Sequence, residues 1–317
     1  MISLMQGDCL DRIIEARLNG VNLFGEPIKL KTSGPVADEF LVPPFSVLDA
    51  RGGDWQQRKR AWQRIGIKGE VGRDSTVIHM GTTSVEKNSA EYVSIFDPMM
   101  CEVAYRWFCP EGGQVVDPFA GGSVRGIVAS LTNRKYWGCD LRKEQIAANA
   151  EQGNELCGDS DNIPVWVCGD SMTELDNAPD ADLVFSCPPY GDLEKYSDLP
   201  GDLSNMEFHT FIDAYKRIIL RSVKRMKENS FACFVVGDFR DKKGFCRNFV
   251  SETINAFELC GAKLYNEAIL VTSVGSASMR VTKQFNSGRK MCKTHQNVLV
   301  FCKGDWRKAA RKCIVSV

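Results

Sequence analysis

The sequence predicts an α/β protein in which a mostly parallel sheet is flanked by helices on both faces. From about residue 114, short apolar segments alternate with helical patterns, and each apolar segment ends at a polar or glycine-containing turn. Such alternation is typical of buried strands that are joined by crossover helices. Residues 1–90 lack it and contain several prolines and many glycines. We therefore expect an irregular N-terminal region packed on a sheet domain of residues 91–317.

The individual elements are predicted from their apolar patterns. The expected strands are Gln114–Asp117, Lys135–Cys139, Val165–Cys168, Leu183–Ser186, Phe231–Val236, Leu264–Val271 and Asn297–Phe301. The expected helices are Trp55–Ile65, Val124–Leu131, Arg142–Gln152, Glu207–Lys227 and Phe245–Leu259. The clearest is Glu207–Lys227, where Phe211, Tyr215 and Ile218 recur at spacings of three and four. The polar stretch Thr272–Gln296 between the last two strands suits a functional loop or a hairpin extension.

Composition restricts the class of protein. The 317 residues include 40 basic and 40 acidic ones, so any nucleic-acid surface has to be a local patch. The 13 cysteines are odd in number and scattered, without a CxxC pair, and only 3 histidines are present. This pattern disfavours structural zinc and a disulfide framework, and we expect no metal. No apolar run reaches the length of about 18 residues that a membrane span needs, so we expect a cytoplasmic protein.

The segment VVDPFAGGS (Val115–Ser123) is a candidate cofactor-binding turn. Asp117 ends a predicted strand, and Gly121 and Gly122 let a ligand approach the backbone where a Cβ atom would exclude it. Ligands of open parallel sheets bind outside the carboxyl ends of the strands. Neither GxGxxG nor GxxxxGKS/T occurs, which disfavours nicotinamide cofactors and nucleoside triphosphates.

Two further aspartates end the strands that follow. Asp140 lies where an acid can bind ribose hydroxyls, and Asp170 can accept a hydrogen bond from an adenine amino group. Three acidic strand ends without a phosphate motif suit a cationic cofactor that contains a ribose and an adenine. The alternative is a merely tight turn with two aspartates as helix N-caps. The cofactor-binding candidates from these turns are Asp117, Pro118, Phe119, Ala120, Gly121, Gly122, Asp140, Leu141, Asp170 and Ser171.

A second candidate turn, SCPPYGDLEKYSD (Ser186–Asp198), follows the fourth strand. Its two prolines fix the backbone and remove two N–H donors, and the aromatic ring of Tyr190 comes directly after them. Methylation of an amine needs acceptors that orient its hydrogens and leave the nitrogen lone pair facing the methyl donor. A carbonyl beside Pro188 and the side chain of Cys187 can supply them, and Tyr190 can stack on a base. The catalytic candidates are Ser186, Cys187, Pro188, Pro189 and Tyr190. A Pro-Pro-aromatic turn alone, however, is common and usually carries no function.

These turns resemble motifs of the amino-group DNA methyltransferases, specifically the phage- and prophage-type DNA modification methylases. DPFAGGS is similar to the cofactor motif of this family, and CPPY to its catalytic (D/N/S)PP(Y/F/W) motif. FDPMM (Phe96–Met100) is similar to the segment that contacts the methionine end of the cofactor, which adds Phe96 and Asp97 to the candidates. The resemblance covers roughly residues 94–302.

The resemblance implies a Rossmann-like class I methyltransferase fold with a mostly parallel seven-stranded sheet flanked by helices. It also implies S-adenosyl-L-methionine as cofactor, double-stranded DNA as partner, and a bacterial or phage-infected cell. The expected activity is that of a site-specific DNA methyltransferase acting on an exocyclic amino group, with adenine N6 weakly favoured over cytosine N4. The recognition element is expected in the N-terminal region or in the inserts after Tyr190 and Thr272.

One position departs from the family pattern. Cys187 stands where the family has Asp, Asn or Ser, and a thiol is a weaker acceptor than a carboxylate or an amide. A thiolate also attacks carbon well, which would fit a C5-cytosine nucleophile. Those enzymes carry their cysteine after the proline pair, whereas Cys187 precedes it, and this order disfavours the nucleophile.

Two basic segments are candidates for a DNA-binding surface. Arg51 to Arg73 contains seven basic and two acidic residues with Trp55 and Trp62 interleaved, and Arg280 to Lys293 contains no acid. Such patches neutralise phosphates, while aromatic side chains can wedge or stack. The alternative is a solvated helix face and a flexible basic loop. The DNA-binding candidates are Arg58, Lys59, Arg60, Arg64, Arg280, Lys283, Arg289 and Lys290.

Two other functions are compatible with these motifs. The same fold can methylate RNA or a protein side-chain amide, because Pro-Pro-aromatic turns serve those substrates too. The second is a catalytically weak DNA-binding protein in which Cys187 has replaced the acceptor.

Overall fold

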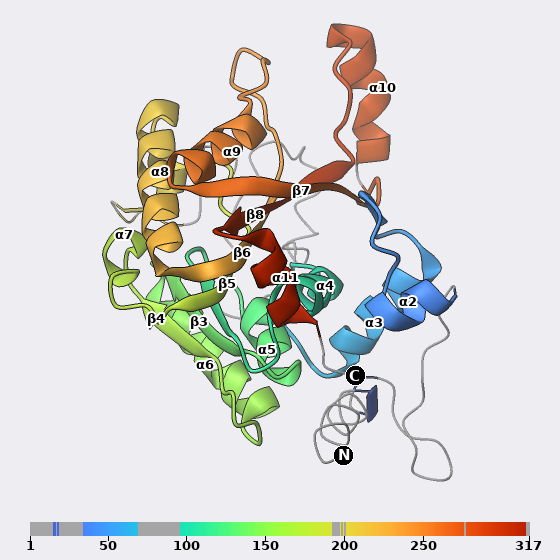
Figure 1. Cartoon of the computed structure of the whole chain (residues 1–317). Coiled ribbons are helices and arrows are strands. Elements are labelled where there is room, and N and C mark those ends of the chain that lie inside the picture. Colours follow the sequence, from blue (N-terminus) through green and yellow to red (C-terminus); the bar gives the residue numbers. More distant parts are fainter. Residues whose placement is uncertain are drawn as a thin grey trace.

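The computed structural model in Figure 1 describes residues 34–68, 96–191, 201–275 and 277–314, together with Glu15, Ala16, Leu18, Ser197 and Leu199. Within these residues one eight-stranded sheet has the order β1-β7-β8-β6-β5-β2-β3-β4. Strand β8 runs antiparallel to β6 and β7, and all other neighbours are parallel. The Rossmann-like, mostly parallel α/β fold expected from the sequence is therefore confirmed.

All seven predicted strands are present, and an eighth joins them. The strands are β1 (Val47–Asp49), β2 (Gln114–Asp117), β3 (Lys135–Asp140), β4 (Val165–Cys168), β5 (Ala181–Ser186), β6 (Met226–Val236), β7 (Ala262–Val271) and β8 (His295–Lys303). Strand β1 comes from the N-terminal region and pairs with the edge of β7. Three residues are too short to show a period of two, which explains why the sequence did not predict it.

Helices cover both faces of the sheet (Figure 1). They are α2 (Pro35–Phe40), α3 (Gly53–Arg64), α4 (Pro98–Phe108), α5 (Val124–Leu131), α6 (Lys143–Cys157), α7 (Ser171–Glu174), α8 (Phe208–Arg225), α9 (Phe249–Leu259), α10 (Ala277–Gly288) and α11 (Trp306–Cys313), with the 3-10 helix η2 (Leu203–Asn205). One apolar core lies between the sheet and α3, α4, α5, α6 and α11. A second lies between the other face and α7, α8 and α9.

Helix α10 belongs to neither core. It lies in the polar stretch between β7 and β8 and contains no buried residue. Figure 1 shows it standing away from the body of the molecule, beyond the ends of β7 and β8. The stretch Thr272–Gln296 is thus a hairpin extension that carries a helix, which is one of the two forms expected from the sequence.

The strand order sets the position of the functional site. The chain runs from β2 outward to β3 and β4, then returns to β5 on the other side of β2 and continues to β6. The order therefore reverses between β2 and β5, and open sheets bind ligands outside the carboxyl ends of the strands at such a point. Because β8 is antiparallel, its first residues lie at this same edge. The predicted domain boundary near residue 90 lies outside the described residues.

Candidate active site

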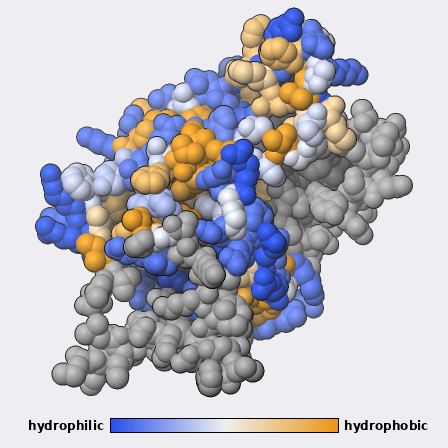
Figure 2. Space-filling view, turned by 90° about the vertical axis from the view of Figure 1, so that its right-hand side faces the viewer, coloured by the Kyte–Doolittle hydropathy of each residue, from blue (hydrophilic) through white to orange (hydrophobic). Residues whose placement is uncertain are grey.

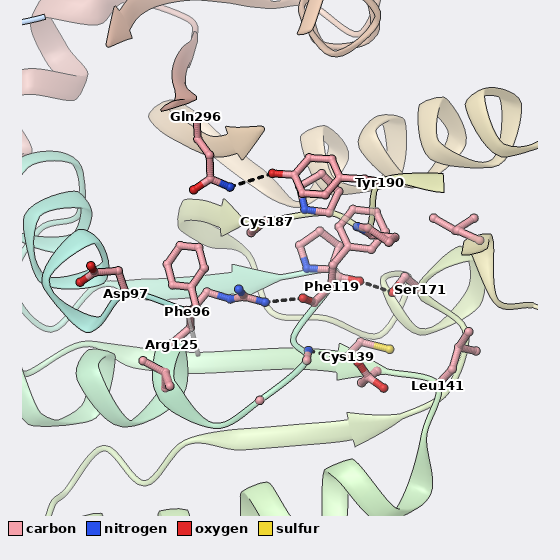
Figure 3. A pocket seen from close by; sticks show the side chains of 18 of the residues that line it. Phe96, Asp97, Phe119, Arg125, Cys139, Leu141, Ser171, Cys187, Tyr190 and Gln296 are labelled. Carbon is pink, nitrogen blue, oxygen red and sulfur yellow. Dashed lines mark hydrogen bonds between the residues drawn. The ribbon is translucent and has the colours of Figure 1, made fainter. Parts of the chain in front are cut away.

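A cavity of about 460 Å³ opens at the carboxyl ends of β2, β3 and β5 (Figure 3). Fourteen of the predicted cofactor-binding and catalytic residues line it: Phe96, Asp97, Pro118, Phe119, Gly121, Gly122, Asp140, Leu141, Asp170, Ser171, Cys187, Pro188, Pro189 and Tyr190. Asp117, Ala120 and Ser186 do not, because their side chains are fully buried beneath it. The two turns that the sequence singled out therefore share one cavity.

Asp117 supports the pocket from below. Its carboxylate accepts hydrogen bonds from Arg125 Nε at 2.5 Å, Ser186 Oγ at 2.6 Å, Tyr136 Oη at 2.8 Å and the backbone N–H of Phe119 at 3.1 Å. The prediction that Asp117 contacts a cofactor is therefore wrong for its side chain. Since Ser186 is one of its donors, Asp117 joins the cofactor turn to the catalytic turn, and Ser186 is a structural residue.

Arg125 is the buried cation under the cofactor turn, and the sequence analysis did not find it. Its guanidinium binds Asp117, donates to the carbonyls of Phe119 and Ala120, and lies 4.9 Å from the ring centre of Phe96. Burial disfavours its charged form, but the Asp117 carboxylate outweighs burial and raises the pKa of Arg125 well above its usual range. Arg125 thus fixes the backbone of the turn. No local sequence pattern predicts that an arginine is buried and paired with an aspartate in this way.

The backbone of the glycine turn is fixed by hydrogen bonds to two side chains. Gly121 has a φ of 51°, a left-handed conformation that favours glycine, and its N–H donates to Asp140 Oδ2 at 3.1 Å. Its carbonyl accepts from Asn149 Nδ2 at 2.7 Å. A Cβ atom added at Gly122 would meet nothing within 4 Å, so this residue faces open pocket space.

The two acidic strand ends both line the pocket. Asp140 also accepts from the N–H of Arg142 at 2.9 Å, and burial raises the pKa of its carboxyl above the usual value. Asp170 caps α7 by accepting from the N–H of Met172 at 2.8 Å. The N-cap alternative is therefore correct for Asp170 as a local structure, and the same carboxylate still faces the cavity.

Two more lining residues escaped the sequence analysis near this end. A Cβ atom at Gly201 would lie 3.3 Å from Asp170 Oδ2 and 3.4 Å from Leu141 Cδ2, so only glycine leaves this wall unobstructed. The carboxylate of Asp202 also lines the cavity and accepts from Ser204 Oγ at 2.7 Å. The lining then includes four acidic residues, Asp97, Asp140, Asp170 and Asp202. Three basic residues, Lys59, Arg125 and Arg142, also line the cavity, so the carboxylates exceed the cations by one, and this balance suits a ligand with a positive charge.

The opposite wall comes from the segment before α4. Asp97 caps α4 through the N–H of Met99 at 3.0 Å and accepts from Trp55 Nε1 at 3.2 Å. Lys59 Nζ lies 3.1 Å from Asp97 Oδ2 and also lines the cavity. Lys59 was predicted to bind DNA, and the structure places it in the pocket wall instead.

The catalytic turn forms the upper part of the cavity in Figure 3. Pro188 is buried, whereas Cys187, Pro189 and Tyr190 are half-buried. The ring of Tyr190 packs edge-to-face on Phe239 and Phe249, with centroid distances of 6.3 and 6.2 Å. Its hydroxyl accepts a hydrogen bond from Gln296 Nε2 at 2.9 Å. The aromatic ring is therefore fixed from behind and at its tip.

The first basic segment does not form the predicted DNA surface as a whole. Arg58 is buried in ion pairs with Glu102 and Glu15, both at 2.7 Å, so its assignment to phosphate binding is wrong. Trp55 and Trp62 are also buried and cannot wedge between bases. Only Arg60 and Arg64 of the candidates on α3 are exposed. The helical period of α3 turns the other side chains toward α4.

The four DNA-binding candidates of the second basic segment are all exposed. Arg280 and Lys283 lie on α10, and Arg289 and Lys290 directly follow it. Figure 2 shows hydrophobic and hydrophilic side chains side by side at the top of the molecule, where α10 lies. The apolar members include Met279 at 73% and Met291 at 77% exposure. Thr272 and Ser273, at the base of this arm, line the cavity.

Comparisons with known proteins concern the fold. No family model and no curated protein matches the chain. Among solved structures, TrmN from Thermus thermophilus aligns at 13% identity and a TM-score of 0.45, over 65% of this chain and 48% of that chain. Magnesium protoporphyrin IX methyltransferase (ChlM) from Synechocystis PCC 6803, with bound SAM, aligns at 10% identity and 0.44, over 77% and 89%. The cyclase SpnF aligns at 11% identity and 0.46, over 68% and 83%. Similarities this weak do not specify a reaction or a substrate, and the match to TrmN covers less than two thirds of its length.

Two further findings concern only the described part of the chain. None of its helices is both long and apolar enough to cross a membrane. None of its side-chain clusters brings together three or more His, Cys, Asp or Glu residues that could hold a metal ion.

Proposed function

We propose that the chain is an S-adenosyl-L-methionine-dependent methyltransferase that modifies an exocyclic amino group of a DNA base. The observation that carries this proposal is that both candidate turns open into one cavity, at the point where the strand order reverses. A transfer reaction needs its donor and its acceptor in contact, and a shared cavity meets this requirement.

The pocket residues fit the proposed cofactor. The carboxylate of Asp140 would hold the ribose hydroxyls, and Asp170 with Leu141 would hold the adenine. Gly121 and Gly122 leave room for the centre of the cofactor, while Asp97 and Lys59 provide opposite charges for the amino and carboxyl groups of its methionine end. When bound, the cofactor supplies an electrophilic methyl group on a sulfonium cation. The excess of carboxylates in the pocket favours that positive charge.

The catalytic turn fits a planar amine. Tyr190 offers an aromatic face that packing holds in place, and stacking on such a face is worth about 1–3 kcal/mol per base. The rigid Pro188–Pro189 pair fixes the direction of the neighbouring carbonyls. Acceptors at this turn would orient the amine hydrogens so that the nitrogen lone pair faces the methyl donor.

Basic charge on the arm that carries α10 supports a nucleic-acid substrate. The arm that carries α10 rises from Thr272 and Ser273 at the pocket wall, and its charged side chains are all basic. Basic side chains there can neutralise phosphates while one base enters the cavity, as enzymes that act on a base require. We therefore place recognition in this arm and in the exposed Arg60 and Arg64, and not in α3 as a whole.

The test is methyl transfer from labelled S-adenosyl-L-methionine to unmethylated duplex DNA, single-stranded DNA, RNA and protein in parallel. Nucleoside mass spectrometry then identifies the product, with N6-methyladenine as the first expectation and N4-methylcytosine as the second. A Tyr190→Ala variant serves as the activity control. Transfer to RNA or protein alone would overturn the DNA substrate, and cofactor binding without transfer would favour a DNA-binding protein that has lost catalysis.

A further inference from the structure

Gln296 lies in the wall of the cavity, although no motif in the sequence points to it. It is the second residue of β8, and the antiparallel register pairs Asn297 with Val236, which places Gln296 beside Gly237. A Cβ atom at Gly237 would lie 3.8 Å from Tyr190 Oη. The Tyr190 hydroxyl thus lies next to the backbone at Gly237, at the end of β6, where it reaches Gln296 on the neighbouring strand.

The amide of Gln296 has two ends with different tasks. Its Nε2 donates to Tyr190 Oη at 2.9 Å. Figure 3 shows its oxygen on the other side, pointing away from Tyr190 and over the pocket. Because the nitrogen is engaged, the amide presents a hydrogen-bond acceptor to the cavity.

The side chain of the catalytic turn that should accept a hydrogen bond from the amine, Cys187, is a weak acceptor. Cys187 lines the same cavity, and its sulfur is a poor acceptor compared with a carboxylate or an amide oxygen. An amine that must present its lone pair to a methyl donor needs both hydrogens oriented, and each acceptor orients one. The amide oxygen of Gln296, which lies beside Tyr190 at the start of β8, can replace the acceptor that Cys187 does not supply.

We propose that Gln296 positions the target base in two ways: its Nε2 fixes the ring of Tyr190, and its Oε1 accepts a hydrogen bond from the exocyclic amine. This inference rests on the proposed function, and it names a group that orients the amine. Adenine, cytosine and guanine carry an exocyclic amine that can donate to Oε1, whereas thymine has none, so this contact selects against thymine.

Three single variants separate the two tasks. Gln296→Met keeps the length of the side chain and removes both ends, and we expect kcat on DNA to fall by about tenfold to a hundredfold because a buried donor loses its acceptor. Tyr190→Phe breaks only the bond between the two residues and should cost less than Gln296→Met. Gln296→Glu keeps an acceptor and should retain most of the activity. Equal losses in Gln296→Met and Tyr190→Phe would mean that Gln296 acts only through Tyr190, and the contact with the amine would be excluded.

The loss of activity caused by Gln296→Met is also measured in the Cys187→Asn protein. A merely structural role of Gln296 would give the same loss there as in the parent. An amide at position 187 restores the missing acceptor, so Gln296→Met should lose less activity there than in the parent. Affinity for S-adenosyl-L-methionine, measured by calorimetry, should be the same in all variants and shows that the pocket remains folded. An equal loss of activity in the parent and in Cys187→Asn would refute the proposal that Gln296 supplies the acceptor that Cys187 lacks.

Methylation of DNA by the parent protein shows whether this inference alone fails or the proposed function fails as well. If the parent methylates DNA and Gln296→Met does so equally well, this inference fails and the proposed function stands. If the parent transfers no methyl group to any DNA, the proposed function fails, and the role of Gln296 fails with it.

Discussion

The guanidinium of Arg58 donates two hydrogen bonds to the carboxylate of Glu102, at 2.7 and 2.9 Å, and both side chains are buried. Trp62 Nε1 at 2.6 Å and Arg106 Nε at 3.1 Å donate to the same carboxylate. This network joins α3 to α4, and α4 packs against the sheet under the cofactor turn. The buried charge of Arg58 in this basic segment therefore stabilises the packing of α3 on α4 and is not available to a ligand.

Removal of the charge of Glu102 should destabilise the protein. Glu102→Gln removes the fully buried one of the two carboxylates that pair with Arg58 and leaves only Glu15, and we expect a loss of about 3 kcal/mol in the free energy of unfolding. Urea titration followed by circular dichroism measures this loss. Arg64→Gln on the exposed face of the same helix is the matched control and should change stability by less than about 0.5 kcal/mol. Equal midpoints for the two variants would contradict the structural role of the network.

The same network predicts a loss of stability in acid. Burial opposes the charged form of Glu102, but Arg58 and Arg106 outweigh it and lower its pKa from 4.5 to about 2. Between these values the unfolded chain binds a proton that the folded protein does not, so stability rises with pH there. The stabilisation by Glu102 is complete above pH 4.5 and disappears as the pH falls toward 2.

Comparison with a variant isolates this contribution from that of other carboxylates. The difference in unfolding free energy between the parent and Glu102→Gln should be large at pH 7 and should shrink steadily below pH 4.5. A difference that stays constant down to pH 3 would show that the Glu102 carboxylate has an ordinary pKa in the folded protein.

Gly122 provides a clean test of the cofactor site. Valine at Gly122 introduces no backbone strain of the kind expected at Gly121, whose φ is 51°, and its side chain would project into space with no atom within 4 Å. We expect Gly122→Val to fold normally and to lose measurable affinity for S-adenosyl-L-methionine in calorimetry. Gly53→Val is the control, because Gly53 also has nothing within 4 Å and does not line the cavity. Full affinity in a folded Gly122→Val protein would remove the cofactor from this turn.

The arm that carries α10 should account for much of the affinity for DNA. Arg280→Glu, Lys283→Glu and Lys290→Glu together should weaken DNA binding and reduce the salt slope by about one unit per lost phosphate contact. The matched control reverses Arg307, Lys308 and Arg311 on α11, which are also exposed and lie at the opposite edge of the sheet. Fluorescence anisotropy at several salt concentrations measures both. The same slope in the two triple variants would mean that the arm is only a solvated helix.

Substitution of Cys187 distinguishes an acceptor from a nucleophile. If Cys187 orients the amine, Cys187→Asn and Cys187→Asp should retain or raise activity, because both side chains are stronger acceptors of similar reach. If its thiolate attacked carbon, both variants would be inactive. Mass spectrometry of methylated nucleosides decides between them. Two inactive variants together with 5-methylcytosine from the parent would refute amino-group methylation.

The sequence by itself determined seven of the eight strands, helices α3, α5, α6, α8 and α9, the glycine turn and the proline turn. These features depend on local apolar periods and on residue types with restricted backbones, and such signals are present in short stretches of chain. The position of the two turns at one sheet edge also followed, because the carboxyl ends of parallel strands lie at the same edge. Strand β6 shows the limit: its first residues, Lys227–Asn229, are polar and gave no strand signal, although the strand begins at Met226.

The tertiary structure alone decided which charged and polar side chains face the pocket. Asp117 and Asp140 both end strands, yet Asp117 is turned inward by Arg125 while Asp140 lines the cavity. Arg58 and Arg60 are two positions apart, and the turn of the helix buries one and exposes the other. Gln296 lies 106 residues after Tyr190, and only the antiparallel insertion of β8 beside β6 brings their side chains to 2.9 Å. Such contacts depend on strand pairing between distant segments, and no local pattern in the sequence encodes that pairing.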